Sequence, residues 1–337
     1  MRLDLESLKQ ITYGAVSVND LGDHYTFSRM TPEQLKYYEN VSEDWYKKAL
    51  TPASVKLRFK SNTKNLRIKV DVAPFNYRYY FSIDVLVDGK YHDSMKNFDD
   101  NNLPKHCDGY KFPIGEHEKN FTFDEGEKVI TVIFPWSVVT KFLDISIDDG
   151  ASITSCPYGE KVIIYGDSIT QGCDALYSRN TYVNRFLEHY NFEGYSKAIG
   201  GERYCPEFAK LKDSFTPKYI LVSYGSNDWY YKNREQFIND AIAFMSALRN
   251  NYGNVKIIAL SPIWRANKFL ETPFGDFEGV YDALKFALQS FENIHLINGR
   301  HFVDENELLF LDYTLHPNDE GFEQFFNSLK QELDKVL

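Results

Sequence analysis

Cysteine is scarce in this sequence and never clustered. The 337 residues contain four cysteines at wide, irregular spacings, with no Cys-x-x-Cys pair: Cys107, Cys156, Cys173 and Cys205. Zinc sites and disulfide frameworks need cysteines at short, regular spacings, so neither is predicted. No histidine pair stands at metal-ligand spacing either. We therefore expect free thiols and no bound metal.

Long apolar runs and basic stretches are also missing. No apolar span reaches the 18 residues of a membrane helix, and the opening residues, MRLDLESLKQ, lack the apolar stretch of a signal peptide. The formal net charge is −10. Nucleic acid and anionic membranes require a basic face on their partner. We therefore expect a soluble, cytoplasmic protein that binds neither, and the sequence makes no prediction about its oligomeric state.

The first half of the chain shows a period of two. Between residues 53 and 150, apolar residues alternate in SVKLRFKS, NLRIKVDV, FSIDVLVDGKY and EKVITVIFPW, as in half-buried strands. Asp88-Gly89 predicts a tight hairpin, and the polar segments SNTKN and DEGEK predict further breaks between strands. Residues 1–155 are therefore predicted to form a β-sandwich of jelly-roll type.

The pattern changes near residue 156. Short apolar runs, KVIIYGD, YILVSYGSND, VKIIALSPI and IHLING, now alternate with segments of helical period such as REQFINDAIAFMSALRNNY and YDALKFALQSFE. This alternation indicates βαβ units around a parallel sheet. Residues 156–337 are therefore predicted to form an α/β domain.

Polar residues follow several of the predicted parallel strands. Ligands bind at the carboxyl ends of such strands. The polar segments are GDS (166–168), GSNDW (225–229), SPIWR (261–265) and LDYTLHPNDEGF (311–322), the last just before a final helix. We expect these four loops to converge on one site.

In this order, GDSIT, GSND and LHPNDEGF resemble the motifs of SGNH (GDSL-type) hydrolases, a superfamily of esterases and deacylases, over roughly the last 180 residues. The resemblance implies that Ser168 is the nucleophile and His316 the base. It places the oxyanion hole on the Ser168 amide, the Gly201 amide and Asn227. Gly200 is an alternative to Gly201, because the two are adjacent.

The residue types fit this chemistry. A serine attacks only when a base removes its proton, and an amide donor such as Asn227 stabilises the charge that develops in the transition state. The alternative interpretations are Ser168 as a plain helix cap and His316 as a solvated loop residue. The presence of Ser168, His316 and Asn227 in one sequence favours the catalytic interpretation. Cys173 is interpreted as a small buried residue.

One position departs from the family pattern. The family usually has Asp three residues before the histidine, but that residue here is Tyr313, and Asp312 lies four before. Either a looped backbone brings Asp312 to the imidazole, or a main-chain carbonyl or another acid such as Asp304 orients the ring. We favour Asp312.

Several neighbouring residues are assigned supporting or binding roles. Asp167 and Asp228 are expected to brace their loops through hydrogen bonds. Trp229, Trp264 and Arg265 are candidate substrate-binding residues, although Trp229 fits the core equally well.

A β-sandwich ahead of an SGNH domain resembles the arrangement in carbohydrate esterases of the acetyl-xylan and acetyl-mannan type. We therefore predict a serine esterase that removes O-acetyl groups from oligosaccharides, with no cofactor. One alternative is a short-chain esterase, thioesterase or lysophospholipase that acts on non-sugar esters. Another is a non-catalytic carbohydrate-binding protein on a hydrolase scaffold. Fold alone does not decide among these substrates.

Overall fold

The computed structural model describes residues 1–75, 78–103 and 111–337, so the prediction of a free thiol at Cys107 falls outside the described residues. The fold is mixed α/β, with antiparallel strands in the N-terminal part and a parallel sheet in the C-terminal part, which confirms the predicted fold class. The chain divides into two compact units. The first comprises Met1–Gly159, Leu176–Arg179 and Leu187–Tyr195, and the second comprises Glu160–Ala175, Asn180–Phe186 and Ser196–Leu337.

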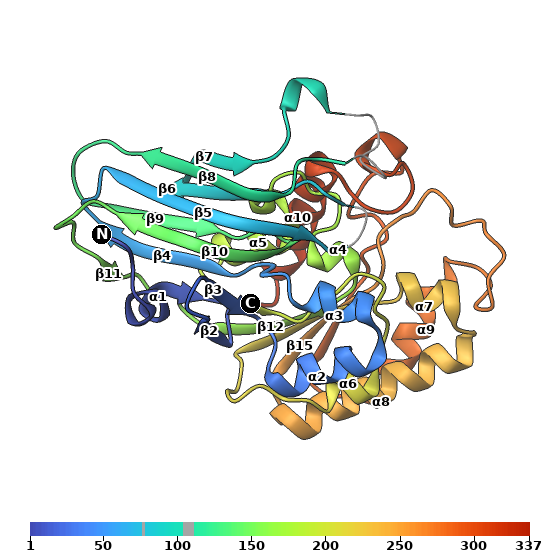
Figure 1. Ribbon diagram of the computed structural model, residues 1–337. Helices are drawn as coiled ribbons and strands as arrows, with labels where there is room; N and C mark the ends of the chain where they lie inside the picture. Colours follow the sequence, from blue (N-terminus) through green and yellow to red (C-terminus); the bar gives the residue numbers. More distant parts are fainter. Residues whose placement is uncertain (76–77, 104–110) are drawn as a thin grey trace. The chain divides into compact units, whose positions relative to one another are not determined.

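The first unit contains two antiparallel sheets. One has the order β1 (Thr12–Tyr13), β4 (Lys56–Ser61), β9 (Lys128–Ile133), β6 (Ser82–Val87) and β7 (Lys90–Lys96), with β11 (Thr154–Ser155) also paired to β4. The other has the order β2 (Ser17–Asp20), β3 (Tyr25–Ser28), β10 (Val138–Ile147), β5 (Asn65–Pro74) and β8 (Gly115–Thr122). From β3 to β10 the chain passes between the sheets after nearly every strand (Figure 1). This is the strand order of a jelly roll.

The alternation seen in the sequence sets the faces of these strands. Leu66, Ile68 and Val70 of β5 are buried in the sandwich core, whereas the intervening Arg67 is exposed. The predicted hairpin joins β6 to β7. Its two loop residues have positive φ, 49° at Asp88 and 76° at Gly89, as a type I′ turn requires.

The N-terminal 52 residues form elements that the period-two pattern did not predict. Besides strands β1 to β3, they contain the helices α1 (Leu5–Ile11), α2 (Pro32–Val41) and α3 (Glu43–Ala49). Helix α2 begins with a capping box, in which the Thr31 side chain accepts from the Gln34 amide and the Gln34 side chain accepts from the Thr31 amide. A short 3-10 helix, η1 (Asp100–Asn102), follows β7.

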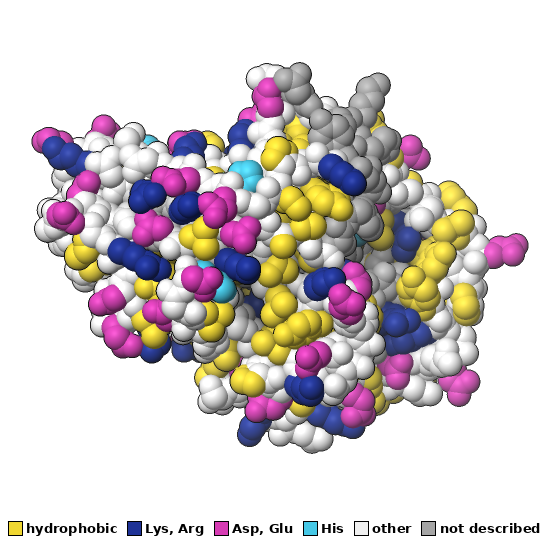
Figure 2. All heavy atoms as spheres, viewed as in Figure 1, with side chains coloured by type: hydrophobic (Ala, Val, Ile, Leu, Met, Phe, Trp, Pro, Cys, Tyr) yellow, Lys and Arg dark blue, Asp and Glu magenta, His cyan; other side chains and the backbone are white. Residues whose placement is uncertain are grey.

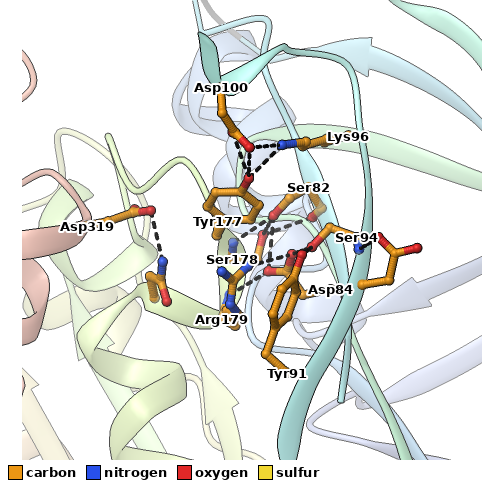
Figure 3. Close-up of polar contacts among 12 residues, drawn as sticks. Ser82, Asp84, Tyr91, Ser94, Lys96, Asp100, Tyr177, Ser178, Arg179 and Asp319 are labelled. Carbon is orange, nitrogen blue, oxygen red and sulfur yellow. Dashed lines mark hydrogen bonds and ion pairs between the residues drawn. The ribbon is translucent and has the colours of Figure 1, made fainter. Parts of the chain in front are cut away.

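A segment from later in the sequence completes the first unit through a buried polar cluster (Figure 3). Asp84 of β6 is fully buried and accepts hydrogen bonds from Ser94 Oγ at 2.6 Å and from the Arg179 amide at 2.8 Å. The Arg179 guanidinium lies 3.4 Å from Asp84 Oδ1 and packs over two aromatic rings, Tyr91 at 3.8 Å and Tyr177 at 4.1 Å. Burial raises the pKa of Asp84, and the Arg179 charge opposes that effect.

The C-terminal sheet has the order β13 (Glu193–Ser196), β12 (Lys161–Gly166), β14 (Tyr219–Ser223), β15 (Lys256–Leu260) and β16 (Ile294–Ile297). Strands β12, β14, β15 and β16 are parallel neighbours. The near-continuous apolar sequences of β12, β14 and β15 reflect burial on both faces, as in βαβ folds, whereas the edge strand β16 is mostly half-buried. The four apolar runs singled out in the sequence correspond to these four strands, whereas β13 was not predicted.

Helices flank this sheet. The second unit contains α4 (Ser168–Gln171), α6 (Pro206–Ala209), α7 (Ser226–Tyr231), α8 (Arg234–Tyr252), α9 (Gly279–Leu288), α10 (Asp319–Leu333) and η3 (Glu307–Leu309), while η2 (Ser178–Asn180) and α5 (Tyr182–His189) include residues of both units. Helix α8 packs against α6 and α9, and its Phe244 contacts Tyr165 of β12 with 5.5 Å between the rings. Tyr182 of α5 stacks on Phe325 of α10 at 4.0 Å.

The described part of the chain contains no helix with both the length and the apolar character needed to cross a bilayer. On the molecular face drawn in Figure 2, acidic and basic side chains are interspersed. Among the described residues, no disulfide joins Cys156, Cys173 and Cys205, and Cys173 is buried as expected.

Candidate active site

Ser168 stands where β12 turns directly into α4. A side chain on Gly166 would place its Cβ 2.2 Å from Thr170 Oγ1, so only glycine lets the strand end this close to the helix. Asp167, and not Ser168, caps α4, because its Oδ1 accepts a hydrogen bond from the Ile169 amide at 3.0 Å. The hydroxyl of Ser168 is therefore not used as a cap.

Three side chains, one from the start of α4 and two from the loop before α10, form a hydrogen-bonded chain. The Nε2 atom of His316 lies 2.8 Å from Ser168 Oγ, and its Nδ1 atom lies 2.7 Å from Asp312 Oδ2. The structure thus brings together Ser168, His316 and Asp312. This order of hydroxyl, imidazole and carboxylate is the arrangement that activates a serine nucleophile.

A left-handed residue accounts for the departure from the family spacing. Tyr313 has φ of 56°, so the backbone turns sharply between Asp312 and His316. The turn is held by Asp312 Oδ1, which accepts from the amides of Thr314 at 2.9 Å, Leu315 at 2.8 Å and His316 at 3.1 Å. The looped backbone places Asp312 at the ring.

Hydrogen bonds and the charge of the His316 ring keep Asp312 ionised. Burial acts to raise the pKa of Asp312, but the hydrogen bonds from the His316 ring and from the loop amides outweigh it and hold that pKa well below its usual range. The alternative acid, Asp304, is exposed, and its amide donates to Gln324 Oε1 at 3.0 Å. The structure therefore places Asp312, and not Asp304, beside His316.

The two adjacent glycines differ in how their amides are used. The Gly200 amide donates to Gln171 Oε1 at 2.8 Å. Within the described ranges, the amides of Ser168 and Gly201 donate to no protein acceptor. Gly201 also has φ of 90°, a conformation that favours glycine. The geometry thus favours Gly201 over Gly200 as an amide donor.

Asn227 is held at the start of α7 by contacts that leave it partly exposed. Its Nδ2 donates to the Glu202 carbonyl at 3.0 Å, which uses one of the two amide hydrogens. Glu202 is fixed in turn by the Tyr224 hydroxyl, 2.8 Å from its Oε2. The neighbouring Asp228 is fully buried and accepts from Lys232 Nζ at 2.8 Å. Burial raises the pKa of Asp228, and the Lys232 charge opposes this.

Trp229 is part of the core. Its side chain has no exposed surface, and Nε1 donates to the Gly275 carbonyl at 2.8 Å. From the sequence, Trp229 could equally be a core residue or one wall of the substrate site. Its complete burial identifies it as a core residue.

Trp264 and Arg265 are also buried, at 6% and 5% exposure, and their contact with a substrate stays a prediction. Arg265 lies 4.7 Å from the Trp229 ring and donates to the Ser226 carbonyl at 3.2 Å, so it braces the loop that carries Asn227. Burial lowers the pKa of Arg265 to about 10. Trp264 packs against Phe310, with 5.3 Å between the rings. The sequence predicted that Trp264 and Arg265 follow β15 (Lys256–Leu260), but it did not predict the direction of their side chains.

Sequence reasoning missed Asp174, a second carboxylate near the imidazole. Its side chain is 2% exposed, and its Oδ2 lies 3.8 Å from His316 Nδ1. Asp174, Asp312 and His316 have possible ligand atoms within 4.8 Å of one another, a grouping that can hold a metal ion. Both ring nitrogens of His316 already hydrogen-bond to Asp312 and Ser168, however, so the arrangement is that of a hydrogen-bonded triad.

Comparisons with known proteins agree with the motifs. Residues 164–324 match the model of the GDSL-like Lipase/Acylhydrolase family, a segment that contains Ser168, Asn227 and His316. No curated protein matches the sequence.

Solved structures match both parts of the chain. A salicylyl-acyltransferase, SsfX3, from a tetracycline biosynthetic pathway has a TM-score of 0.80 at 18% identity, covering 96% of this chain and 94% of its own. A Bacteroides ovatus protein described as a GDSL-like lipase has a TM-score of 0.73 at 19% identity, and the match covers 100% of this chain and 97% of that protein. A family two carbohydrate esterase from Clostridium thermocellum has a TM-score of 0.61 at 12% identity, and the match covers 84% of this chain and 95% of that protein. At these identities the likeness shows a shared fold.

Proposed function

We propose that this chain, which carries a domain of the GDSL-like lipase/acylhydrolase family in residues 164–324, is a serine esterase that removes O-acetyl groups from oligosaccharides. The observation that carries the proposal is the continuous chain of hydrogen bonds from Asp312 through His316 to Ser168. A partly buried triad of this geometry has a clear chemical use, because each group activates or orients the next.

The reaction proceeds in two halves. His316 Nε2 takes the proton of Ser168 Oγ as that oxygen attacks the ester carbonyl carbon, and the carbonyl electron pair moves onto oxygen. The amides of Ser168 and Gly201 and the second Nδ2 hydrogen of Asn227 stabilise this oxyanion. The intermediate collapses, the sugar alcohol leaves with the proton from His316, and water then hydrolyses the acyl-enzyme in the same way to release acetate.

Asp312 supports both halves of the reaction. Its carboxylate accepts the Nδ1 hydrogen of His316, which leaves Nε2 as the base toward Ser168. When the ring gains the proton, the adjacent negative charge stabilises the imidazolium. The three amide hydrogen bonds to Asp312 keep that carboxylate in place.

The substrate class is supported by the two-part fold. The C. thermocellum carbohydrate esterase shares both the sandwich and the hydrolase fold across 84% of this chain. The similarity to a salicylyl-acyltransferase across 96% of the chain favours a second candidate, transfer of the acyl group to a hydroxyl acceptor other than water. Both reactions pass through the same acyl-enzyme. A purely carbohydrate-binding role would give the triad no use.

Acetate release separates these possibilities. The full-length protein would be assayed on a panel of acetylated oligosaccharides and on p-nitrophenyl esters of increasing chain length, with and without added sugar acceptors. We expect efficient acetate release from acetylated sugars, abolished in Ser168→Ala and unchanged in Ser290→Ala, an exposed serine. Acyl-sugar products without free acetate would identify a transferase. Turnover of long-chain or non-sugar esters alone would contradict the carbohydrate assignment.

A further inference from the structure

Asp174 occupies an uncommon position for a charged residue. It lies in the turn that follows α4, where Gly172 has φ of 111° and the Cys173 amide donates to the Ser168 carbonyl at 2.9 Å. The Ala175 amide closes the turn on the Gly172 carbonyl at 3.1 Å. Asp174 itself has φ of 76°, and its side chain is almost wholly buried. Buried acids occur in charged or hydrogen-bonding environments, and the His316 ring is one such neighbour of Asp174.

We propose that Asp174 is a positioning residue that acts with Asp312 to stabilise the protonated form of His316, an inference that rests on the proposed serine mechanism. Its Oδ2 lies 3.8 Å from His316 Nδ1, within ion-pair range but too far for the hydrogen bond that Asp312 makes at 2.7 Å. Asp312 thus sets the tautomer and orientation of the ring. Asp174 contributes mainly charge.

The charged groups around the ring favour the imidazolium. Asp312 comes from the same loop as His316, Asp174 from the turn after α4, and Asp167 from the residue before the nucleophile, which also interacts electrostatically with His316. Arg265 is a cation that interacts with two of these carboxylates, Asp167 and Asp312. Asp312 and Asp174 therefore lie within ion-pair range of a ring that becomes positive only when it takes the serine proton, and Asp167 also interacts electrostatically with that ring.

This arrangement acts selectively on the transition state. A negative charge 3.8 Å from a neutral imidazole gains little, whereas the same charge beside an imidazolium gains a direct ion pair. The interaction is thus stronger after proton transfer than before it, which is the condition for raising kcat. It also predicts that Asp174 supplies part of the stabilisation when the Asp312 charge is removed.

The test is the pH dependence of kcat/KM in the variant Asp174→Asn. Asparagine tolerates the left-handed backbone as aspartate does, so the turn is expected to persist. Loss of the charge should lower the pKa of His316 by about one unit and move the acid limb of kcat/KM for an aryl acetate to lower pH. We expect kcat to fall roughly tenfold, with KM unchanged. Adding Asp174→Asn to Asp312→Asn should cost more activity than Asp312→Asn alone.

Direct titration of His316 by NMR in the substrate-free protein gives a readout that does not depend on activity. The exposed Asp304→Asn variant is the matched control, for which neither the titration nor the acid limb should move. An unchanged His316 titration in folded Asp174→Asn, or the same shift in Asp304→Asn, would overturn the role of Asp174. Failure of the serine mechanism would appear differently, as activity retained by Ser168→Ala.

Discussion

At the scale of single residues, Asn227 offers the clearest separation of catalysis from binding. One Nδ2 hydrogen is fixed on the Glu202 carbonyl, so the amide is oriented before substrate arrives. The other is proposed to strengthen its hydrogen bond only when the carbonyl oxygen becomes negative.

Replacing Asn227 by alanine should therefore lower kcat by on the order of 10² to 10³ with little change in KM. Steady-state kinetics on an aryl acetate and on an acetylated oligosaccharide would measure both constants. The exposed Asn254→Ala is the control and should behave as wild type. An effect confined to KM would instead make Asn227 a substrate-binding residue.

Asp167 is buried directly beside the nucleophile. Burial raises its pKa from 3.8 to about 6, and the Ile169 amide and the His316 charge offset this only in part. Because the folded-state pKa lies above the unfolded one, the contribution of Asp167 to stability is fully present below about pH 4 and is lost as pH rises through 6.

Asp167→Asn should remove the free-energy cost of burying a charged carboxylate, while it keeps a good helix cap. Urea unfolding should show a gain in unfolding free energy of roughly 1 to 3 kcal/mol at pH 8 and none near pH 4. The exposed Asp304→Asn would serve as the comparison at both pH values. A gain of equal size at both pH values would show that the charge of Asp167 is not its source.

The sequence predicted the residue types of this site better than their geometry. Ser168, His316 and Asn227 could be named because their chemistry and order restrict the possibilities. The choice of Asp312 depends on the backbone angle of Tyr313, which no residue letter specifies. Asp174 lies outside every recognised motif, and its relation to His316 arises only when the turn after α4 is folded.

At the scale of elements, periodicity identified part of the regular structure and missed strands β8 and β10 of the sandwich. Strands β4 and β5 and helix α8 correspond to the segments predicted for them, because a long amphipathic or apolar stretch has few other ways to bury its side chains. Strand β13 was missed because it is four residues long and begins with a glutamate and a glycine. Helix α2 carried a readable start signal, the capping box formed by Thr31 before the helix and Gln34 in its first turn.

The polar cluster on β6 and β7 predicts a large stability effect within the sandwich unit. Truncating Asp84 would leave the Arg179 guanidinium and the Ser94 hydroxyl without their buried acceptor. We expect Asp84→Ala to lower the unfolding free energy by about 3 to 5 kcal/mol. Glu39→Ala, which removes the exposed ion pair with Lys36, should change it by less than about 1 kcal/mol.

Urea unfolding followed by circular dichroism would compare these two variants with wild type. A loss for Asp84→Ala no larger than that for Glu39→Ala would mean that the buried cluster does not stabilise the sandwich. The intermediate variant Asp84→Asn keeps an acceptor and should lie between the two.

At the scale of the whole molecule, the sandwich unit is not continuous in sequence. It takes in Leu176–Arg179 and Leu187–Tyr195, which come after Ser168 in the chain. Lys56 pairs with Glu188 at 2.6 Å, and Arg58 donates to Asn191 at 2.8 Å within this unit. A change in hydrophobic period marks where the strand pattern ends, but it does not reveal that later segments return to an earlier unit.

The most direct measurement for the whole protein is covalent labelling by a fluorophosphonate, followed by peptide mass spectrometry. An activated serine attacks the phosphorus, expels fluoride and keeps a stable phosphonyl ester. We expect one label per chain on the peptide that contains Ser168, absent in Ser168→Ala, strongly reduced in His316→Ala and unchanged in Ser290→Ala. Acetate release should be lost in Ser168→Ala and His316→Ala and kept in Ser290→Ala. A label on another residue, or Ser168→Ala that still releases acetate at the wild-type rate, would contradict the assignment of Ser168 as the nucleophile.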